Sequence, residues 1–407
     1  MQNEFDPINF QIRTKEVYEY HVRKIREDLR NESIYGIKCD SPFNQLCYYH
    51  VTSGLPPDIM HDILEGVAPY EIGLVLKHFC KEGFISYDFL NTQIRKWKYG
   101  SLDSRNKPVE IDPTTGKLKQ NAGRIWCLLR LLPLMIGHKV PRGNFYWDLI
   151  MQVKDISEIV FAPQIAKSHV AILHMHIQDN LHLFKELFPE SRIKPKQHFM
   201  IHYPKHLLQY GPLKSCWCMR FEAKHNYFKR LVQKLLNFIN VCSTLSNRHQ
   251  FLQCFNQSGN GNLFQNEIEV TGTKPYDKGL PLEIRDKLTI MGVLDTSLQC
   301  RSVTLNGIRY KEGMYLIDSF IEDDPVFGKI LAMFVKDYKL HFALKLFRST
   351  YDIHFRAYNL QEVCEYNVLT SELMIDYYPL TCYILKKKMW IVLKHLAFDP
   401  SKYISLS

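Results

Sequence analysis

The chain has 407 residues, of which 46% are hydrophobic and 13% aromatic, a composition that excludes a disordered protein and allows two or three domains. Its formal net charge of +10 favours a polyanionic partner, with nucleic acid as the first candidate. Eleven scattered cysteines and the polar amino terminus MQNEFDPINFQIRTK argue against a secreted, disulfide-bonded protein and indicate a reducing compartment.

The first 123 residues contain two predicted helical stretches and a loop. Residues 1–53 include the charged helical stretch TKEVYEYHVRKIREDLRNES and no visible strand. From Pro56 to near Gly83, apolar residues recur at intervals of three and four, which predicts a helix. Residues 100–123 are rich in turn formers and charge, so we expect a loop there.

Helices are predicted to dominate residues 124–255. The longest apolar stretch, IWCLLRLLPLMIG at 125–137, contains Arg130 and Pro133 and is shorter than the roughly 20 apolar residues that a bilayer requires. We therefore expect a soluble protein with no membrane partner. Further along, Pro163 is predicted to interrupt or bend a long helical segment.

The pattern changes after a polar, turn-rich stretch at 256–297, which we interpret as a linker. The run RSVTLNGIRYKEGMYLID alternates around Asn306 and Gly307, a strong hairpin signal, and several strand-like runs follow it. The predicted organisation is a mainly helical region at 1–255, the linker, and a small antiparallel β domain at 298–407. That domain is expected to be a barrel or sandwich of roughly five to seven strands.

The stretch GLPPDIMHDILEG at 54–66 has two interpretations. Asp58 is a good helix N-cap, and Asp62 and Glu65 would favour the positive end of the helix dipole. That interpretation leaves His61 unexplained. Asp58, His61 and Glu65 are spaced to share one helix face, and such a face could bind a divalent ion or organise a nearby metal site.

A second cluster at 194–231 combines histidines, cysteines and bases. His198 and His202 could form a zinc site with Cys216 and Cys218, although the spacing matches no standard module. Glu222 is either an ion-paired surface residue or a metal-binding carboxylate in a nucleic-acid cleft. The basic residues around it would hold phosphates: Arg220, Lys224, His225, Lys229 and Arg230.

The stretch LLNFINVCSTLSNRHQ at 235–250 is predicted to be a helix. Its polar side would offer Asn237, Asn240, Arg248, His249 and Gln250, either as an exposed helix end or as nucleic-acid contacts. Four aromatic residues alternate with basic residues nearby: Trp217, Phe221, Tyr227 and Phe228. Such aromatic residues more often belong to the core than stack on nucleobases.

Four stretches occur in order, LPPDIMHDILEG, KQHFMIHYPKHLLQYGPL, MRFEAKHNYFK and TLSNRHQ. Together, over about residues 5–270, they resemble the CACTA-related (Plavaka-like) transposases of DNA transposons. The resemblance implies an RNase H-like core with a helical insertion, a DNA partner and a nuclear location. It also implies two Mg²⁺ or Mn²⁺ ions held by Asp, Asp and Glu for strand transfer. Glu222 matches the third carboxylate, and Asp58 and His61 match an Asp-x-x-His motif that accompanies the second.

The departure from that pattern concerns the first two catalytic aspartates. Asp6, Asp28 and Asp40 lie in polar or helical contexts rather than at the end of a strand, and Asp58 opens a helix. We therefore expect a truncated transposase that is inactive alone and retains nucleic-acid affinity. A homo-oligomer is possible, and the cytoplasm is the alternative to a nuclear location. The rival interpretation is a non-catalytic helical scaffold whose β domain binds a protein partner along a strand edge.

Overall fold

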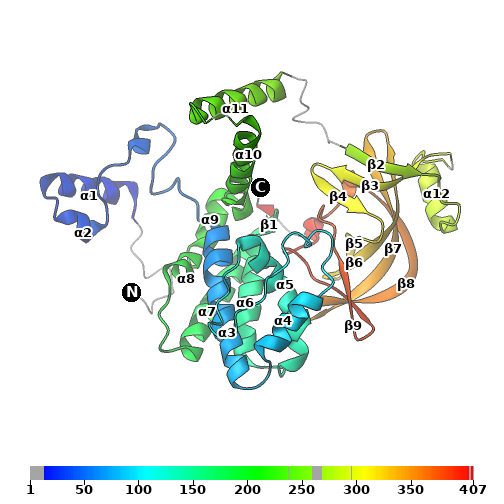
Figure 1. Cartoon of the computed structure of the whole chain (residues 1–407), viewed down its shortest axis with the longest axis horizontal. Helices are drawn as coiled ribbons and strands as arrows, with labels where there is room; N and C mark the ends of the chain where they lie inside the picture. The colour runs from blue at the N-terminus through cyan, green and yellow to red at the C-terminus, as the bar shows by residue number, and fades with distance from the viewer. Residues whose placement is uncertain (1–12, 237, 259–267, 295, 403–404, 407) are drawn as a thin grey trace. The chain divides into compact units, whose positions relative to one another are not determined.

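A computed structural model of the chain describes residues 13–236, 238–258, 268–294, 296–402 and 405–406. Helices come first and antiparallel sheets follow, as predicted (Figure 1). The chain forms two compact units, the first made of residues 1–72, 145–217 and 405–407 and the second of residues 73–144 and 218–404. This division differs from the expected one, because residues 73–144 group with the β region.

The first unit is built from helices. α6 (Phe145–Val160) packs against α7 (Lys167–Leu187), α7 packs against α9 (Tyr203–Tyr210), and α8 (Pro195–Met200) packs on η3 (Met60–Val67). Pro163 lies between α6 and α7, where an interruption was predicted. The shorter elements of this unit are α1 (Lys15–Glu27), α2 (Asn31–Tyr35), η2 (Pro42–Gln45), η5 (Leu213–Ser215) and the paired strands β1 (Ile165–Ala166) and β11 (Ser405–Leu406).

The helix predicted from Pro56 to Gly83 continues from η3 into α3 (Ala68–Lys81), which runs from the first unit into the second. The other helices of the second unit are α4 (Tyr87–Lys96), α5 (Ala122–Ile136), η4 (Gly137–Lys139), α10 (Met219–Leu235), α11 (Val241–Gln257) and α12 (Leu282–Ile290). α5 holds the apolar stretch at 125–137 and is buried along its second half. No helix in the described residues is both long and apolar enough to cross a membrane.

A buried ion pair fixes the loop at 100–121 within the second unit. Arg130 of α5 donates to the carboxylate of Asp103 at 2.5 Å, and the hydroxyl of Tyr383 lies 3.5 Å from that carboxylate. The ring of Trp97 packs at 5.4 Å from the ring of Tyr383. The contacts of Tyr383 with Asp103 and Trp97 join residues more than 250 positions apart, which explains why the expected boundary at 255 does not separate the loop from the strands.

The β region consists of two antiparallel sheets. The larger has the order β5 (Tyr315–Ile321), β6 (Asp324–Lys336), β7 (Lys339–Asp352), β8 (Ala357–Thr370), β10 (Lys388–Ile391) and β9 (Cys382–Leu385). The smaller has the order β2 (Ile268–Lys274), β3 (Gln299–Leu305) and β4 (Ile308–Lys311). Val303 and Tyr310 of the smaller sheet share a core with Met333 and Phe342 of the larger. β5 and β9 end the larger sheet in the described residues, so it does not close into a barrel, although an isolated antiparallel bridge joins Tyr315 of β5 to Leu380.

The predicted hairpin is confirmed: Asn306 and Gly307, with φ of 50° and 77°, connect β3 to β4. The predicted linker is not irregular throughout, since β2 and α12 lie within 256–297. Ile284 and Leu288 of α12 are fully buried against the larger sheet, whereas the turn-rich composition hides this short apolar pair. Residues 259–267 and 295 of the linker, together with Asp6 and Asn237, lie outside the described residues.

Candidate functional site

The motif GLPPDIMHDILEG leads into a π-helix, η3, which spans Met60–Val67. π-helical turns are rare and are frequently found at functional sites. The π-helical segment begins at Met60 with Ile59 as its N-cap residue, and it is kinked at Glu65, which has a φ of −113° and a ψ of 15°. Asp58, the predicted N-cap, lies one residue earlier, and its Oδ1 accepts a hydrogen bond from the Met60 N–H at 3.3 Å.

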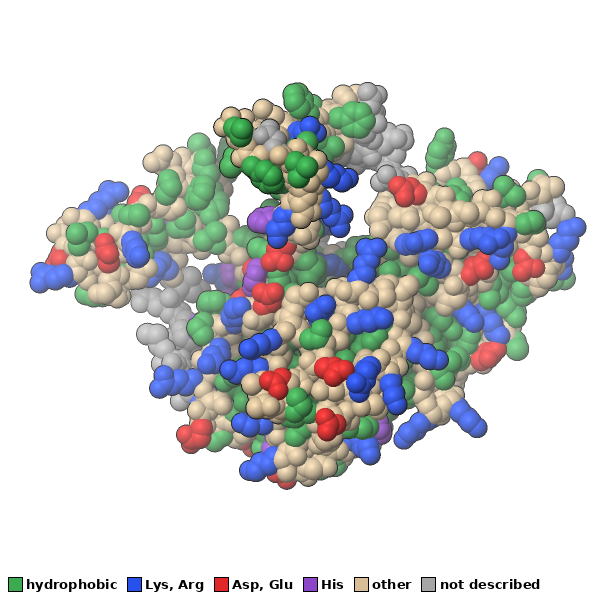
Figure 2. Space-filling view, viewed as in Figure 1, with side chains coloured by type: hydrophobic (Ala, Val, Ile, Leu, Met, Phe, Trp, Pro, Cys, Tyr) green, Lys and Arg blue, Asp and Glu red, His purple; other side chains and the backbone are tan. Residues whose placement is uncertain are grey.

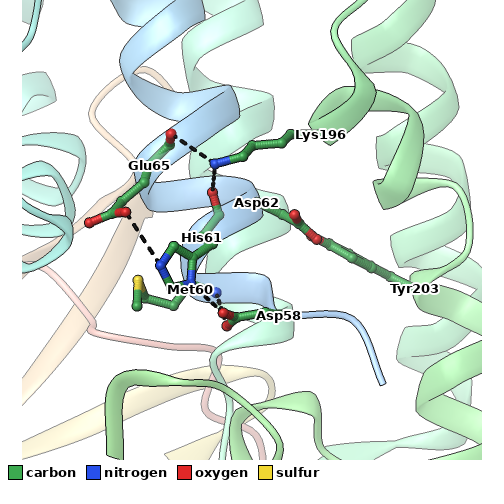
Figure 3. A network of polar contacts seen from close by, with 7 residues as sticks. All are labelled: Asp58, Met60, His61, Asp62, Glu65, Lys196 and Tyr203. Carbon is green, nitrogen blue, oxygen red and sulfur yellow. Dashed lines mark hydrogen bonds and ion pairs between the residues drawn. The ribbon is translucent and has the colours of Figure 1, made fainter. Parts of the chain in front are cut away.

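Asp58, His61 and Glu65 lie on one face of this helix, as their spacing predicts. The second carboxylate oxygen of Asp58 bonds His61 Nδ1, and His61 Nε2 lies 3.6 Å from the carboxylate of Glu65. Figure 3 shows the imidazole of His61 between the two carboxylates. The side chains are 24–40% exposed, so this face is reachable from solvent. A carboxylate at Nδ1 fixes the orientation of the ring and directs its Nε2 toward Glu65.

This face does not fit the full metal set that the resemblance implies. Mg²⁺ prefers oxygen ligands, whereas an imidazole nitrogen between carboxylates suits one ion such as Mn²⁺ or Zn²⁺. The two-ion mechanism requires three carboxylates, and this face offers those of Asp58 and Glu65. The acidic group between them in sequence, Asp62, is buried and bonded to Tyr203. No strand-transfer step follows from these residues.

Lys196 of α8 anchors the π-helix from outside. Its ammonium group donates to the carbonyl oxygens of His61 at 2.8 Å and Glu65 at 3.2 Å (Figure 3). Gly66 makes this contact possible, because a Cβ atom at that position would lie 2.4 Å from Cδ of Lys196. Nothing in the spacing of residues predicts this contact, since Lys196 lies 130 residues away from Gly66 and lysines are ordinarily surface residues.

Two buried carboxyl groups lie on the other side of the same segment. Burial raises the pKa of Asp62 to about 6, and the hydrogen bond from Tyr203 at 3.2 Å opposes that rise. Burial also raises the pKa of Glu71 to about 7. Glu71 is fully buried and accepts hydrogen bonds from Asn180 at 3.1 Å and Gln197 at 2.8 Å. Both acids are structural groups enclosed by α7, α8 and α9.

Glu222 lies in the second unit, on the first turn of α10, and is exposed. The structure brings Asp58 and His61 together in the first unit, whereas Glu222 belongs to the second unit. The predicted helix at 235–250 is wrong in its bounds. Leu236 and Asn240 have left-handed φ values of 50° and 55°, which end α10 at Leu235 and start α11 at Val241.

α10 and α11 form a basic helix pair without buried residues. Residues 219–257 contain six lysines and arginines against the single acid Glu222, which amounts to half of the net charge of +10 in about a tenth of the chain. In Figure 2, lysine and arginine side chains gather along α10, and apolar side chains cover much of α11. All predicted phosphate-binding residues lie on this pair: Arg220, Lys224, His225, Lys229, Arg230 and Arg248.

The aromatic residues of this region divide into core and surface. Trp217 is buried, with its ring 5.5 Å from that of Phe161, so it is a core residue. Phe221 is 66% exposed, while Tyr227 and Phe228 are half-buried and receive Lys224 over their rings at 4.9 and 6.0 Å. The expectation that these aromatics are core therefore holds for Trp217 and fails for Phe221.

The zinc alternative has no support in the first unit. The rings of His198 and His202 lie 5.4 Å apart in an edge-to-face arrangement. In the described residues, the donor atoms of His198, His202 and Cys216 do not gather within 4.8 Å of one another. Cys218 belongs to the second unit.

Comparison with known proteins adds no relative, because no protein-family model, no curated protein and no solved structure matches the chain.

Proposed function

We propose that this chain derives from a CACTA-related transposase and that it binds nucleic acid through α10 and α11. The observation that carries the proposal is the concentration of positive charge on a helix pair that buries none of its residues. Phosphate contacts supply most of the affinity of non-specific nucleic-acid binding. A surface with six cations and one acid is suited to such contacts.

The apolar side chains of the pair favour a single strand over a duplex. Phe221, Phe251 and Phe255 are 66%, 73% and 56% exposed, which is unusual for phenylalanine. A groove of about 490 Å³ lies between the helices and is lined by Phe228, Lys229 and other side chains. Where basic residues alternate with aromatic residues, the aromatic rings stack on unpaired nucleobases and the cationic side chains bind the phosphate backbone.

Catalysis is not part of the proposed present activity. The ancestral role that the resemblance assigns to Glu222, Asp58 and His61 would require a complete carboxylate set around two ions. Mg²⁺- or Mn²⁺-dependent nicking of a plasmid tests this. We expect none from the wild-type chain. Nicking that is lost in Glu222→Gln would overturn this part of the proposal and return Glu222 to a catalytic role.

The binding proposal is tested by titrating labelled single-stranded and duplex DNA at several salt concentrations. Replacing Lys229 and Arg230 by glutamate should weaken binding at least about tenfold, and each lost phosphate contact should reduce the salt slope by about 0.7 for a single strand. The matched control reverses the charge of Lys77 and Lys81, which are exposed on α3 in the same unit. Equal binding by both double variants, or affinity indifferent to salt, would refute the proposal.

The rival scaffold interpretation has one observation in its favour. In the described residues β2 pairs with β3 alone, and the side chains of its five central residues are exposed. An extended peptide could add to that open edge through main-chain hydrogen bonds. If the nucleic-acid titrations fail, this edge is the next surface to test, with a proline at Val270 to block strand addition.

A further inference from the structure

A cavity of about 750 Å³ in the first unit is separate from the Asp58–His61–Glu65 face and from α10–α11. Its walls come from α1, the segment at 36–39, residues 51–52, the end of α8 and the start of α9. The volume is within the range of about 300–1,000 Å³ that is typical of small-molecule sites. The cavity is lined by all three histidines of the motif KQHFMIHYPKH, which the proposed function does not involve.

The charged groups of this cavity are all cations. Arg13, Lys38 and Lys205 line it, and no aspartate or glutamate is among its lining residues in the described part of the chain. Asp40, the acid nearest in sequence, is engaged by Asn44 at 2.9 Å and lies 3.8 Å from Arg26. The wall therefore attracts an anion.

The start of α9 adds a positive helix end. Pro204 and Lys205 lie in its first turn and line the cavity, so the positive end of the helix dipole faces it. His206 has a buried Nδ1 atom with no hydrogen-bond partner, while its ring stacks on Tyr210. Because His206 lines the cavity, this atom can form a hydrogen bond with a bound polar group.

The histidines are held neutral by their surroundings. Burial lowers the pKa of His202 to about 4, with further lowering by the neighbouring His198, His206 and Lys205. Burial also lowers the pKa of His198 and of His206. A bound anion would favour the protonated form of these histidines and so raise their pKa. The titratable or charged groups that line the cavity are Arg13, Tyr18, Lys38, Cys39, His198, His202, Lys205 and His206.

Part of the wall is apolar. Tyr18, Ile37 and Ile201 are buried hydrophobic residues that line the cavity, and Val51 is half-buried beside them. The Tyr18 hydroxyl is fixed by the Ser41 N–H at 3.1 Å, which holds the phenol ring in place. An inorganic anion would leave this wall uncovered, whereas a larger phosphorylated molecule would fill it.

We propose that this cavity binds a small phosphate-bearing organic ligand, with its phosphates on Arg13, Lys38 and Lys205 and its ring system on the apolar wall. A nucleoside triphosphate has this combination of groups. The site is independent of the nucleic-acid surface proposed for α10 and α11, so either can fail without the other.

Calorimetric titration of the full chain with ATP, pyrophosphate and a 5′-phosphorylated oligonucleotide tests the site. We expect saturable ATP binding that is tighter than pyrophosphate binding and that Lys205→Glu weakens tenfold or more. Lys167→Glu is the control, since Lys167 is exposed on α7 in the same unit and does not line the cavity. Oligonucleotide binding should be unchanged by Lys205→Glu and reduced by the double reversal at Lys229 and Arg230.

Proton uptake gives a second readout. At pH 7.5 the triphosphate is already deprotonated, and a cationic site does not favour its protonation, so protons taken up on binding report the histidines. Calorimetric measurements in two buffers of different ionisation enthalpy give the number of protons taken up. The paired change His202→Asn and His206→Gln, in which asparagine keeps a favourable N-cap for α9, should remove the uptake. Absence of ATP binding, or equal binding by Lys205→Glu and wild type, would overturn the proposal.

Discussion

Replacing Glu71 by glutamine should stabilise the protein above neutral pH. Glu71 is fully buried, and burial raises the pKa of its carboxyl group from 4.5 to about 7. This difference corresponds to about 3 kcal/mol of preference for the protonated form in the folded state. At pH 8 the charged carboxylate therefore lowers the free energy of unfolding by about that amount relative to a neutral side chain.

The hydrogen bonds of the site can survive the substitution. One oxygen of Glu71 accepts from Gln197, and glutamine retains that acceptor. The other oxygen becomes an NH₂ group that faces the Asn180 amide. Because Oδ1 of Asn180 has no partner of its own, the Asn180 amide can rotate by 180° and accept from the new donor. The exchange then removes a buried charge without leaving an additional polar group unpaired.

Urea denaturation between pH 4.5 and 8 measures the effect. The folded state of the wild type holds its proton more tightly than the unfolded state, so this group makes stability fall as pH rises from 4.5 to about 7, and the loss is complete above that. Glu71→Gln should match the wild type near pH 4.5 and exceed it by up to about 3 kcal/mol at pH 8. Glu186→Gln, at an exposed position of α7, should change stability by less than about 0.5 kcal/mol. A Glu71→Gln effect that is independent of pH, or destabilisation at pH 8, would refute the reasoning.

Two further substitutions test contacts on which the units depend. Arg130→Met should cost about 3–5 kcal/mol in thermal or urea unfolding, because it leaves the carboxylate of Asp103 buried without its cation; a loss below 1 kcal/mol would contradict the importance of this pair. Gly66→Ala should cost about 1–3 kcal/mol, because the new Cβ overlaps Lys196. It should cost less in a Lys196→Ala background, where the overlap with Cδ is removed while Cβ of residue 196 at 3.1 Å and the His61 carbonyl oxygen at 3.3 Å remain close. Equal effects of Gly66→Ala in both backgrounds would exclude that overlap as the cause.

The spacing of residues predicted what is local. Asp58, His61 and Glu65 share a face because helical residues three and four apart are neighbours, and this rule survives the wider turn of η3. The turn signal at Asn306 and Gly307 likewise predicted the hairpin between β3 and β4. Neither inference required information about a distant part of the chain.

What the sequence could not predict depends on distant partners. The π-helical form of η3 is accompanied by hydrogen bonds from Lys196 to two of its carbonyl groups, and nothing in the spacing of 54–66 announces them. The burial of Glu71 depends on Asn180 and Gln197 in the same way. α12 was missed although Leu280, Ile284 and Leu288 recur at intervals of four and are buried together, because the turn-rich and polar residues around them indicated a loop.

The first two stretches that carry the transposase resemblance are structural partners. From the stretch around α8 and α9, Lys196 and Tyr203 bond directly to the stretch around η3, and Gln197 bonds to Glu71 just beyond it. Their joint presence in one sequence therefore follows from packing, whether or not a metal ever binds. Packing does not explain the accessible imidazole of His61 between two carboxylates, nor the cations that crowd α10. A stable fold requires neither feature, so these two surfaces are where function must be tested.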